Sequence, residues 1–184
     1  HLLETLVTRD GNSRRFVTTL DAALQRRVAA MVQHHGKALQ EQHIDNVAAL
    51  VIDNRRFEVV AYVGNASDSA SDESGFAIDL IQRPRSSGSI LKPFLFAAML
   101  DAGEITPSML IADLPTQYGG YIPENYDRTF RGAVPASEAL ARSLNVPAVR
   151  MLQQHGVARF YDFLSSMGMS TLHRAPDEYG LSLI

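Results

Sequence analysis

The residues best suited to chemistry are a serine and a lysine one helical turn apart. The stretch SSGSILKPF, residues 86–94, places Ser89 three residues before Lys92, which is one of two lysines beside fifteen arginines. Residues at i and i+3 lie on one face of a helix. A serine hydroxyl becomes a good nucleophile when a nearby base takes its proton, and a desolvated lysine can be that base, whereas arginine stays protonated. The pair predicts an activated serine, although a surface lysine after a serine gives the same short motif.

A second polar pair lies further along the chain. The stretch RSLNVPAVR, residues 142–150, places Ser143 and Asn145 one residue apart, at the junction of two expected helices. Ser and Asn are frequent at helix ends, where they bind free backbone groups, and Pro147 suits the first turn of the next helix. Alone, this pair therefore favours a capping role. Together, a serine–lysine pair and a later Ser-x-Asn turn match the order of parts in serine acyltransferases that react with penicillin.

The first half of the chain predicts a long helix followed by strands. Residues 18–42 have helical apolar spacing, and Thr18 with Asp21 fits a capping signal. The β-rich runs at residues 47–53 and 58–64 predict an antiparallel hairpin, and FAIDLIQ, residues 76–82, predicts a third strand.

The second half predicts mostly helices. A buried helix is expected from the serine–lysine pair to a stop at Gly103, and the region from Ile105 to Val134 is predicted to be loop-rich. Three further helices are expected at residues 135–143, 147–156 and 157–168. The order of elements predicts an α+β fold, an antiparallel sheet flanked by helices.

Composition limits the class of protein. With 184 residues and 46% hydrophobic residues, the chain is large and apolar enough to fold around a core. A net charge of −3 argues against a nucleic-acid-binding surface, and the absence of cysteine excludes disulfides and thiolate metal sites. No apolar run reaches the ~20 residues of a membrane span. Because the sequence starts with His1 and stops in the apolar run YGLSLI, we expect a piece of a longer protein.

The motifs and their surroundings resemble the transpeptidase domain of class A (bifunctional) penicillin-binding proteins, most like the 1C type. The resemblance also covers VTTLDAALQRRV, VAALVIDNRRFEVVAYVG, GGYIPENYDRTFRGAV and SEALARSLNVPAVRML. It implies a penicillin-binding transpeptidase or serine β-lactamase-like fold, with residues 18–184 as its N-terminal two thirds and residues 1–17 as a linker or edge segment. It also implies that Ser89 is the acylated nucleophile and Lys92 its proton acceptor, with Ser143 and Asn145 as the second motif.

The third motif of that family, Lys-Thr/Ser-Gly on an inner strand, is absent from the sequence. Neither Lys37 nor Lys92 is followed by it, and the sequence stops before its expected position. The resemblance assigns part of the oxyanion hole to that strand. We therefore expect these 184 residues alone to be inactive.

The activity implied by the resemblance is D,D-transpeptidation, which cross-links peptidoglycan through a serine acyl-enzyme and is inhibited by β-lactams. Its substrates would be stem peptides, a D-Ala-D-Ala donor and an amine acceptor, with no metal, no organic cofactor and no nucleic acid. The expected location is periplasmic, with a membrane anchor and a glycosyltransferase domain outside this sequence. Two alternatives stay open: a D,D-carboxypeptidase or β-lactamase-like hydrolase that uses water, and a non-catalytic module that keeps the fold.

Other polar residues favour structural roles. His34 and His35 are adjacent, so they cannot share a helix face, and we expect them in solvent. Asp127 in the block PENYD is expected to stabilise a turn rather than line the cleft. A polar loop is predicted to be solubilising rather than a calcium site, since the EF-hand pattern is missing; its acidic residues are Asp68, Asp72 and Glu73.

Overall fold

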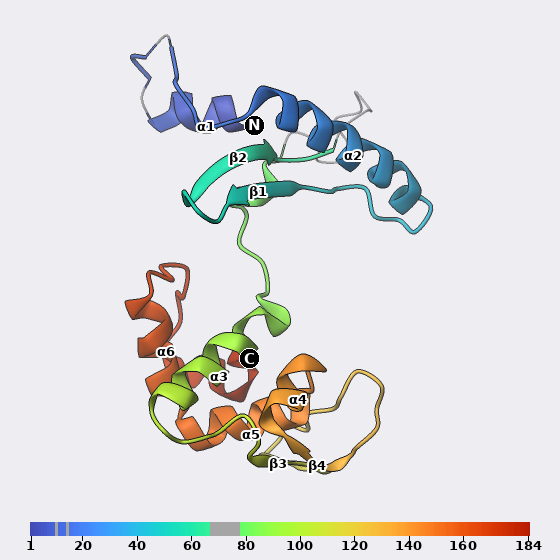
Figure 1. Cartoon of the computed structure of the whole chain (residues 1–184), viewed down its shortest axis with the longest axis vertical. Coiled ribbons are helices and arrows are strands. Elements are labelled where there is room, and N and C mark those ends of the chain that lie inside the picture. Colours follow the sequence, from blue (N-terminus) through green and yellow to red (C-terminus); the bar gives the residue numbers. More distant parts are fainter. Residues whose placement is uncertain (10, 14, 67–77) are drawn as a thin grey trace. The chain divides into compact units, whose positions relative to one another are not determined.

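The computed structural model describes residues 1–9, 11–13, 15–66 and 78–184. The predicted acidic loop with Asp68, Asp72 and Glu73 lies outside the described residues. The chain divides into two units, His1–Pro84 and Arg85–Ile184. Within the described residues the strands form two two-stranded antiparallel sheets, one in each unit, with helices packed on them (Figure 1). This confirms the predicted combination of helices with antiparallel strands.

The first unit consists of two helices and a hairpin. Helix α1 spans Leu2–Arg9, in a region where the sequence predicted only a linker or edge segment, and helix α2 spans Ala22–Gln40. Strands β1 (Ala49–Asp53) and β2 (Glu58–Val63) pair antiparallel, which confirms the predicted hairpin. Helix α2 runs along this hairpin (Figure 1).

The start of α2 differs from the capping prediction. Asp21 is the N-cap, and its Oδ1 accepts a hydrogen bond of 2.7 Å from the Leu24 N–H. Thr18 is not the cap because the chain is still outside the helix there. One helical turn later, the Gln25 amide bonds both backbone groups of Tyr62 in β2, at 3.0 and 2.7 Å. Helix α2 is therefore fixed to the strand by side-chain to backbone hydrogen bonds.

The predicted third strand is wrong where the structure describes it. Residues 78–82 contain a short 3₁₀ turn, η2, at Leu80–Gln82 instead of a strand. Asp79 explains the turn, because its Oδ1 accepts from the Ile81 N–H at 3.1 Å. Its Oδ2 accepts from the Tyr62 hydroxyl at 2.5 Å. The carboxylate thus caps a turn and binds it to β2.

The second unit is mostly helical, as predicted. The buried helix α3 follows a 3₁₀ turn and ends at Asp101. Ala102 is its C-cap, and the next residue, Gly103, has a φ of +68°, in the left-handed region that glycine favours. Helices α4 and α5 both contact strand β3. The elements of this unit are η3 (Gly88–Leu91), α3 (Lys92–Asp101), β3 (Leu110–Asp113), β4 (Gly132–Pro135), α4 (Ala136–Ala141), α5 (Asn145–His155), α6 (Val157–Ser166), α7 (Pro176–Tyr179) and η4 (Gly180–Leu183).

Strands β3 and β4 correct the prediction that Ile105 to Val134 is only loop-rich. They pair antiparallel, with Ala112 opposite Ala133. Each strand has four residues, which is too short to show the period of a strand, and the pairing partner lies far along the chain. The long loop between them carries the block PENYD.

An apolar core holds the second unit together. Helix α3 contributes two of its fully buried side chains, Leu95 and Met99, and a third, Leu91, is the residue just before that helix. Phe160 and Leu152 come from α6 and α5. The remaining members come from the surrounding turns, β3, and helices α4 to α6, so α3 is packed on several sides. The core residues are Leu91, Leu95, Met99, Ile105, Ile111, Ala136, Met151, Leu152, Phe160, Leu164 and Leu183.

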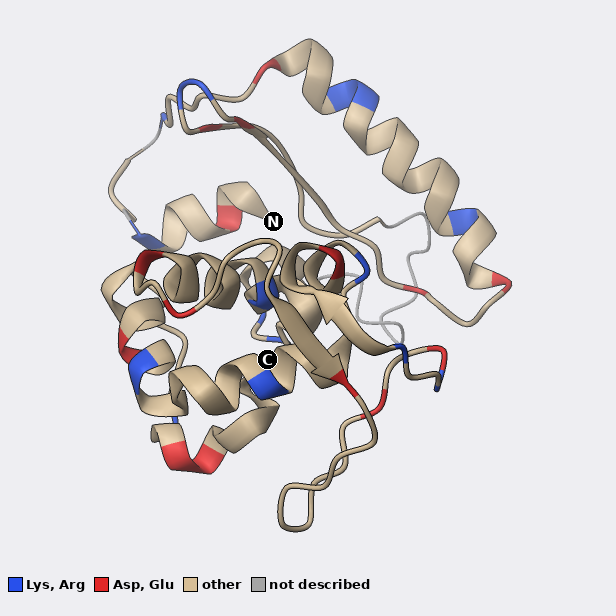
Figure 2. Cartoon of the chain, turned by 60° about the horizontal axis from the view of Figure 1, so that its bottom comes forward, with Lys and Arg blue, Asp and Glu red and all other residues tan. Residues whose placement is uncertain are grey.

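Charged residues of both signs are distributed along the elements of both units (Figure 2). His34 and His35 are exposed on α2, as predicted. In the described part of the chain, no helix is both long and apolar enough to cross a bilayer.

Candidate active site

Lys92 is the most deeply buried cation of the candidate site. It is the first residue of α3, and only 4% of its surface is exposed. Its Nζ donates hydrogen bonds to the Ser143 carbonyl oxygen at 2.7 Å, to Ser143 Oγ at 3.2 Å and to Asn145 Oδ1 at 2.6 Å. The structure thus brings together three of the four predicted site residues, although Lys92 is 51 residues from Ser143 and 53 from Asn145 in sequence.

Burial also changes the acid–base character of Lys92. Removal from water disfavours the ammonium form and lowers the pKa of Lys92 to about 8. At pH 7 roughly one lysine in ten is then neutral, against about one in 3000 at the ordinary pKa of 10.5. A neutral amine has a lone pair and can accept a proton.

Ser89 lies in the 3₁₀ turn η3, directly before α3. Its carbonyl oxygen accepts a hydrogen bond from the Lys92 N–H, and its side chain is exposed. The turn begins at Gly88, whose φ of +53° is a backbone conformation that costs glycine little. Among the described residues, no hydrogen bond joins Ser89 Oγ to Lys92 Nζ. The roles of these two residues in one step remain a prediction.

Ser143 lies in the turn between α4 and α5, as predicted. Its φ of +53° is in the left-handed region, which is uncommon for a residue other than glycine. The turn is held by hydrogen bonds of 2.9 Å from the Ser143 N–H to Leu140 and from the Leu144 N–H to Ala139. Leu144 precedes α5 and makes no side-chain cap bond. Ser143 is therefore not the cap of α5, and its carbonyl and hydroxyl oxygens both accept from Lys92 instead.

Asn145 is the first residue of α5, and its amide is bonded on both sides. Oδ1 accepts from Lys92, while Nδ2 donates to the Glu124 carbonyl at 2.8 Å. Its backbone N–H donates to Asn125 Oδ1 at 2.9 Å. Sequence reasoning missed Glu124 and Asn125 as partners. Both belong to PENYD, but no pattern in that block indicates a contact to a helix that starts 20 residues later.

Asp127, in the same loop, stabilises a turn as predicted. Its Oδ1 accepts from the Thr129 N–H at 3.1 Å, the spacing of an Asx turn, and its Oδ2 accepts from Arg131 at 2.5 Å. The hydrogen bond from Arg131, followed by the one from Thr129, lowers the pKa of Asp127 to about 2. Asp127 also lines a hollow of about 280 Å³ beside Ser143.

The described residues hold no group of three or more His, Cys, Asp or Glu side chains placed to bind one metal ion. The acceptors around Lys92 are two oxygens of Ser143 and the side-chain oxygen of Asn145, which bind an ammonium group by hydrogen bonds. The arrangement fits proton transfer.

Comparison with known proteins gives a consistent result. The family described as penicillin binding protein transpeptidase domain matches residues 47–182. Penicillin-binding protein 1C of Escherichia coli is 37% identical over 169 residues, which is 91% of this chain and 21% of that protein. Penicillin-binding protein 1A of Pseudomonas aeruginosa is 34% identical over 109 residues, 56% of this chain and 13% of that protein. The chain thus spans about one fifth or less of the length of these relatives.

Solved structures show the same fold. The penicillin-binding protein PonA1 from Mycobacterium tuberculosis superposes with a TM-score of 0.69 at 25% identity, over 91% of this chain and 43% of that one. A structure of PonA1 in complex with penicillin V superposes with the same score over 93% of this chain and 46% of that one. These matches confirm the predicted fold, although the chain covers only part of each structure.

Proposed function

Because this chain belongs to the family of penicillin-binding protein transpeptidase domains, we propose that it forms part of a D,D-transpeptidase that cross-links peptidoglycan. The reaction proceeds through an acyl-enzyme on Ser89. The observation that carries the proposal is the environment of Lys92, a buried amine bound to Ser143 and Asn145 at the start of the helix that follows Ser89. An ordinary surface lysine would have none of these contacts.

The first step is acylation. With three acceptors around it, Nζ is bound as an ammonium. Loss of one proton leaves two N–H donors and a lone pair, which turns toward Ser89 Oγ and takes the hydroxyl proton. The Ser89 oxygen attacks the carbonyl carbon of the penultimate D-Ala of a stem peptide. The negative charge on the carbonyl oxygen is stabilised by the Ser89 backbone N–H at the start of the helix.

Collapse of the tetrahedral intermediate breaks the bond to the terminal D-Ala. The proton on Lys92 passes through the Ser143 hydroxyl to the leaving amine, because that hydroxyl is bonded to Nζ and Ser143 lines a hollow. An amine of a second stem peptide then attacks the acyl-enzyme and gives its proton back through the same residues. The products are a new peptide bond and free Ser89, so protons and bonds balance over the cycle.

The remaining features of the intact protein follow from the same proposal. Its substrates are a donor stem ending in D-Ala-D-Ala and an acceptor stem with a free amine. β-Lactams acylate Ser89 as mimics of the donor, in line with the penicillin V complex of the similar protein PonA1. The domain works on the periplasmic side of the inner membrane, held by an anchor outside this sequence.

The test is labelling of the intact protein with a fluorescent penicillin, with Ser89→Ala as the matched control. We expect covalent labelling of the parent and none of the variant. Labelling that persists in Ser89→Ala would assign the nucleophile elsewhere, and a folded parent without labelling would indicate a non-catalytic module. Supplying a donor peptide with and without an acceptor amine then separates transfer from hydrolysis; hydrolysis alone would indicate a carboxypeptidase or β-lactamase.

A further inference from the structure

A buried asparagine outside both motifs holds the start of α5. Asn125 is 3% exposed, and its Oδ1 accepts hydrogen bonds from the N–H groups of Asn145 at 2.9 Å and Val146 at 3.2 Å. The first N–H groups of a helix have no partner inside the helix, and Leu144 supplies no side-chain cap. Asn125 therefore caps α5 from a loop 20 residues upstream.

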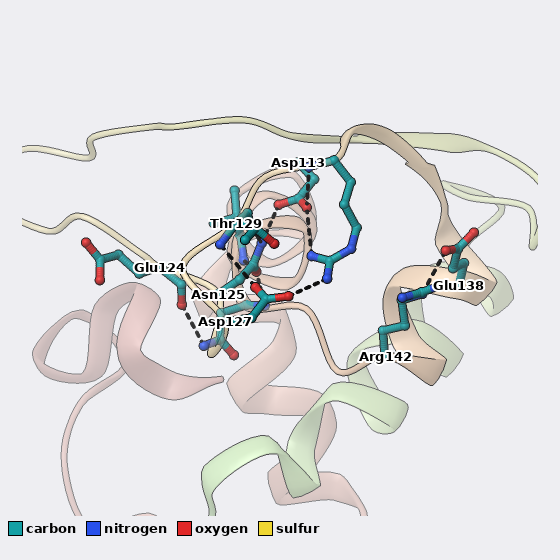
Figure 3. Close-up of polar contacts among 10 residues, drawn as sticks. Asp113, Glu124, Asn125, Asp127, Thr129, Glu138 and Arg142 are labelled. Carbon is teal, nitrogen blue, oxygen red and sulfur yellow. Dashed lines mark hydrogen bonds and ion pairs between the residues drawn. The ribbon is translucent and has the colours of Figure 1, made fainter.

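The other half of the Asn125 amide is equally fixed. Nδ2 donates to Asp113 Oδ1 at 2.7 Å and to the Thr129 carbonyl at 2.9 Å, as Figure 3 shows. Asp113 has 0% exposure, and its Oδ2 accepts from the Arg131 N–H at 3.1 Å, with the Arg131 guanidinium at 3.7 Å. An amide has two donor and two acceptor positions. All four are used, so Asn125 has a single orientation.

The residue before it acts on the same target. The Glu124 carbonyl accepts from Asn145 Nδ2, which leaves Oδ1 as the side of the Asn145 amide that faces Lys92. Glu124 and Asn125 thus bind the side chain and the backbone of one residue of the second motif. Any shift of this loop would move the acceptor that lies 2.6 Å from Lys92 Nζ.

We propose that Asn125 is a positioning residue for acylation. Asp113 holds the Asn125 side chain, and Asn125 fixes the start of α5 and, through Asn145, the position of the Lys92 amine. The inference rests on the proposed function for its catalytic consequence. Its structural part stands separately, because the bonds from Asn125 to α5 are present whatever the reaction is.

The alternative is that Asn125 only contributes to general stability, and the other end of α5 offers a matched control. There the Glu104 carboxylate binds His155 Nδ1 at 2.8 Å and the Arg159 guanidinium at 2.6 Å. Glu104→Gln weakens the C-terminal end of the helix, whereas Asn125→Ala weakens the N-terminal end. A general loss of stability would act on acylation alike in both variants.

The experiment compares both variants with the parent in the intact protein. Misplacement of a catalytic group by ~1 Å costs about 10²-fold in rate, so we expect Asn125→Ala to slow penicillin acylation at least ~10-fold where the protein is folded. Glu104→Gln is expected to stay within about twofold of the parent, although its melting temperature falls. Equal slowing in both variants, or full activity of Asn125→Ala, would overturn the proposal.

Hydrogen exchange measured by mass spectrometry gives a readout that does not depend on activity. Asn125→Ala should lose protection in the peptide containing the Asn145 and Val146 amides, and Glu104→Gln should not. Unchanged protection would refute the role of Asn125 even in a protein that penicillin does not label. Absence of labelling in the parent would refute the proposed function alone.

If Asn125→Ala does not fold, a double variant that exchanges the side chains of residues 113 and 125 tests the proposal. D113N combined with N125D keeps an oxygen on the α5 N–H groups and reverses the donor between residues 113 and 125, with no change in net charge. The exchange gives up the bond to the Thr129 carbonyl, so some loss of overall stability is expected. We expect protected 145–146 amides and acylation within about threefold of the parent. Protected amides with acylation at least tenfold slower, or amides that lose protection in the folded variant, would contradict the proposal.

Discussion

Replacing Lys92 by arginine separates the charge of this residue from its ability to accept a proton. Arginine keeps the positive charge at every accessible pH and cannot act as a base. Its guanidinium is also larger and planar, whereas the Lys92 amine lies within 2.6 to 3.2 Å of three oxygens. We expect Lys92→Arg to lose acylation of Ser89.

The size of the loss follows from the burial of Lys92. A pKa of about 8 instead of 10.5 raises the neutral fraction at pH 7 roughly 300-fold. Loss of general-base catalysis costs about 10²–10⁴-fold in rate. The same residue serves the second proton transfer in the proposed reaction, so a loss at the upper end of this range is expected.

The assay is the second-order rate of fluorescent penicillin acylation in the intact protein, measured from pH 6 to 9.5. Because the proposed reaction uses the neutral form of Lys92, the parent rate should rise about tenfold per pH unit below pH 8 and level off above it. Lys37→Arg is the matched control, since Lys37 is exposed on α2. It should keep both the parent rate and the parent pH profile.

Two results would refute this reasoning. A folded Lys92→Arg variant that is acylated within a few-fold of the parent would mean that Lys92 supplies only a charge. A parent rate that stays level from pH 6 to pH 9.5 would mean that the titration of Lys92 does not control the step. In either case another base would have to take the proton of Ser89.

Two further predictions concern stability. Asp21→Ala removes the cap of α2 and should lower the free energy of unfolding, measured in urea, by about 1 kcal/mol. Asp21→Ser, whose hydroxyl can still cap the helix, should keep most of the parent stability. Equal stability of all three proteins would contradict the capping role of Asp21. Asp127 has a folded pKa of about 2, below that of an unfolded aspartate, because of its hydrogen bond from Arg131. Its contribution is therefore present above about pH 4 and lost as the pH falls toward 2. The free energies of unfolding of the parent and of Asp127→Asn, which keeps the Asx oxygen, should differ at pH 6 and converge near pH 2. A difference that stays constant with pH would exclude the Asp127–Arg131 ion pair as its cause.

Helices α2 to α6 and the first hairpin were predictable because their signals are local, whereas α1 and the short α7 were not predicted. Helix α3 has apolar residues on several sides and a proline near its first turn, and the hairpin has two β-rich runs close in sequence. The third strand was predicted from the same kind of signal and was wrong. There a single aspartate, Asp79, bonds a turn and Tyr62 at once, and a residue pattern does not show a partner 17 positions away.

The candidate site likewise has parts that the sequence predicts and parts that it does not. The spacing of Ser89 and Lys92, and the short Ser143–Asn145 pair, were readable because each motif is compact. The bonds of Asn125 to Asp113 and to α5 were not, because each joins positions 12 to 21 residues apart. An asparagine in a loop has the same appearance whether it faces solvent or is buried. Only the tertiary fold distinguishes a turn residue from one that orients the site.

Ser143 shows why a local reading of the second motif points in the wrong direction. By propensity, a serine before a helix is a cap, and a position with φ near +53° calls for glycine or asparagine. Ser143 does not cap α5, and it is neither glycine nor asparagine. This conformation directs both the carbonyl and the hydroxyl of Ser143 to Lys92, and glycine would supply only the carbonyl. Backbone strain retained for a hydroxyl group is the pattern expected where chemistry, rather than stability, determines the residue.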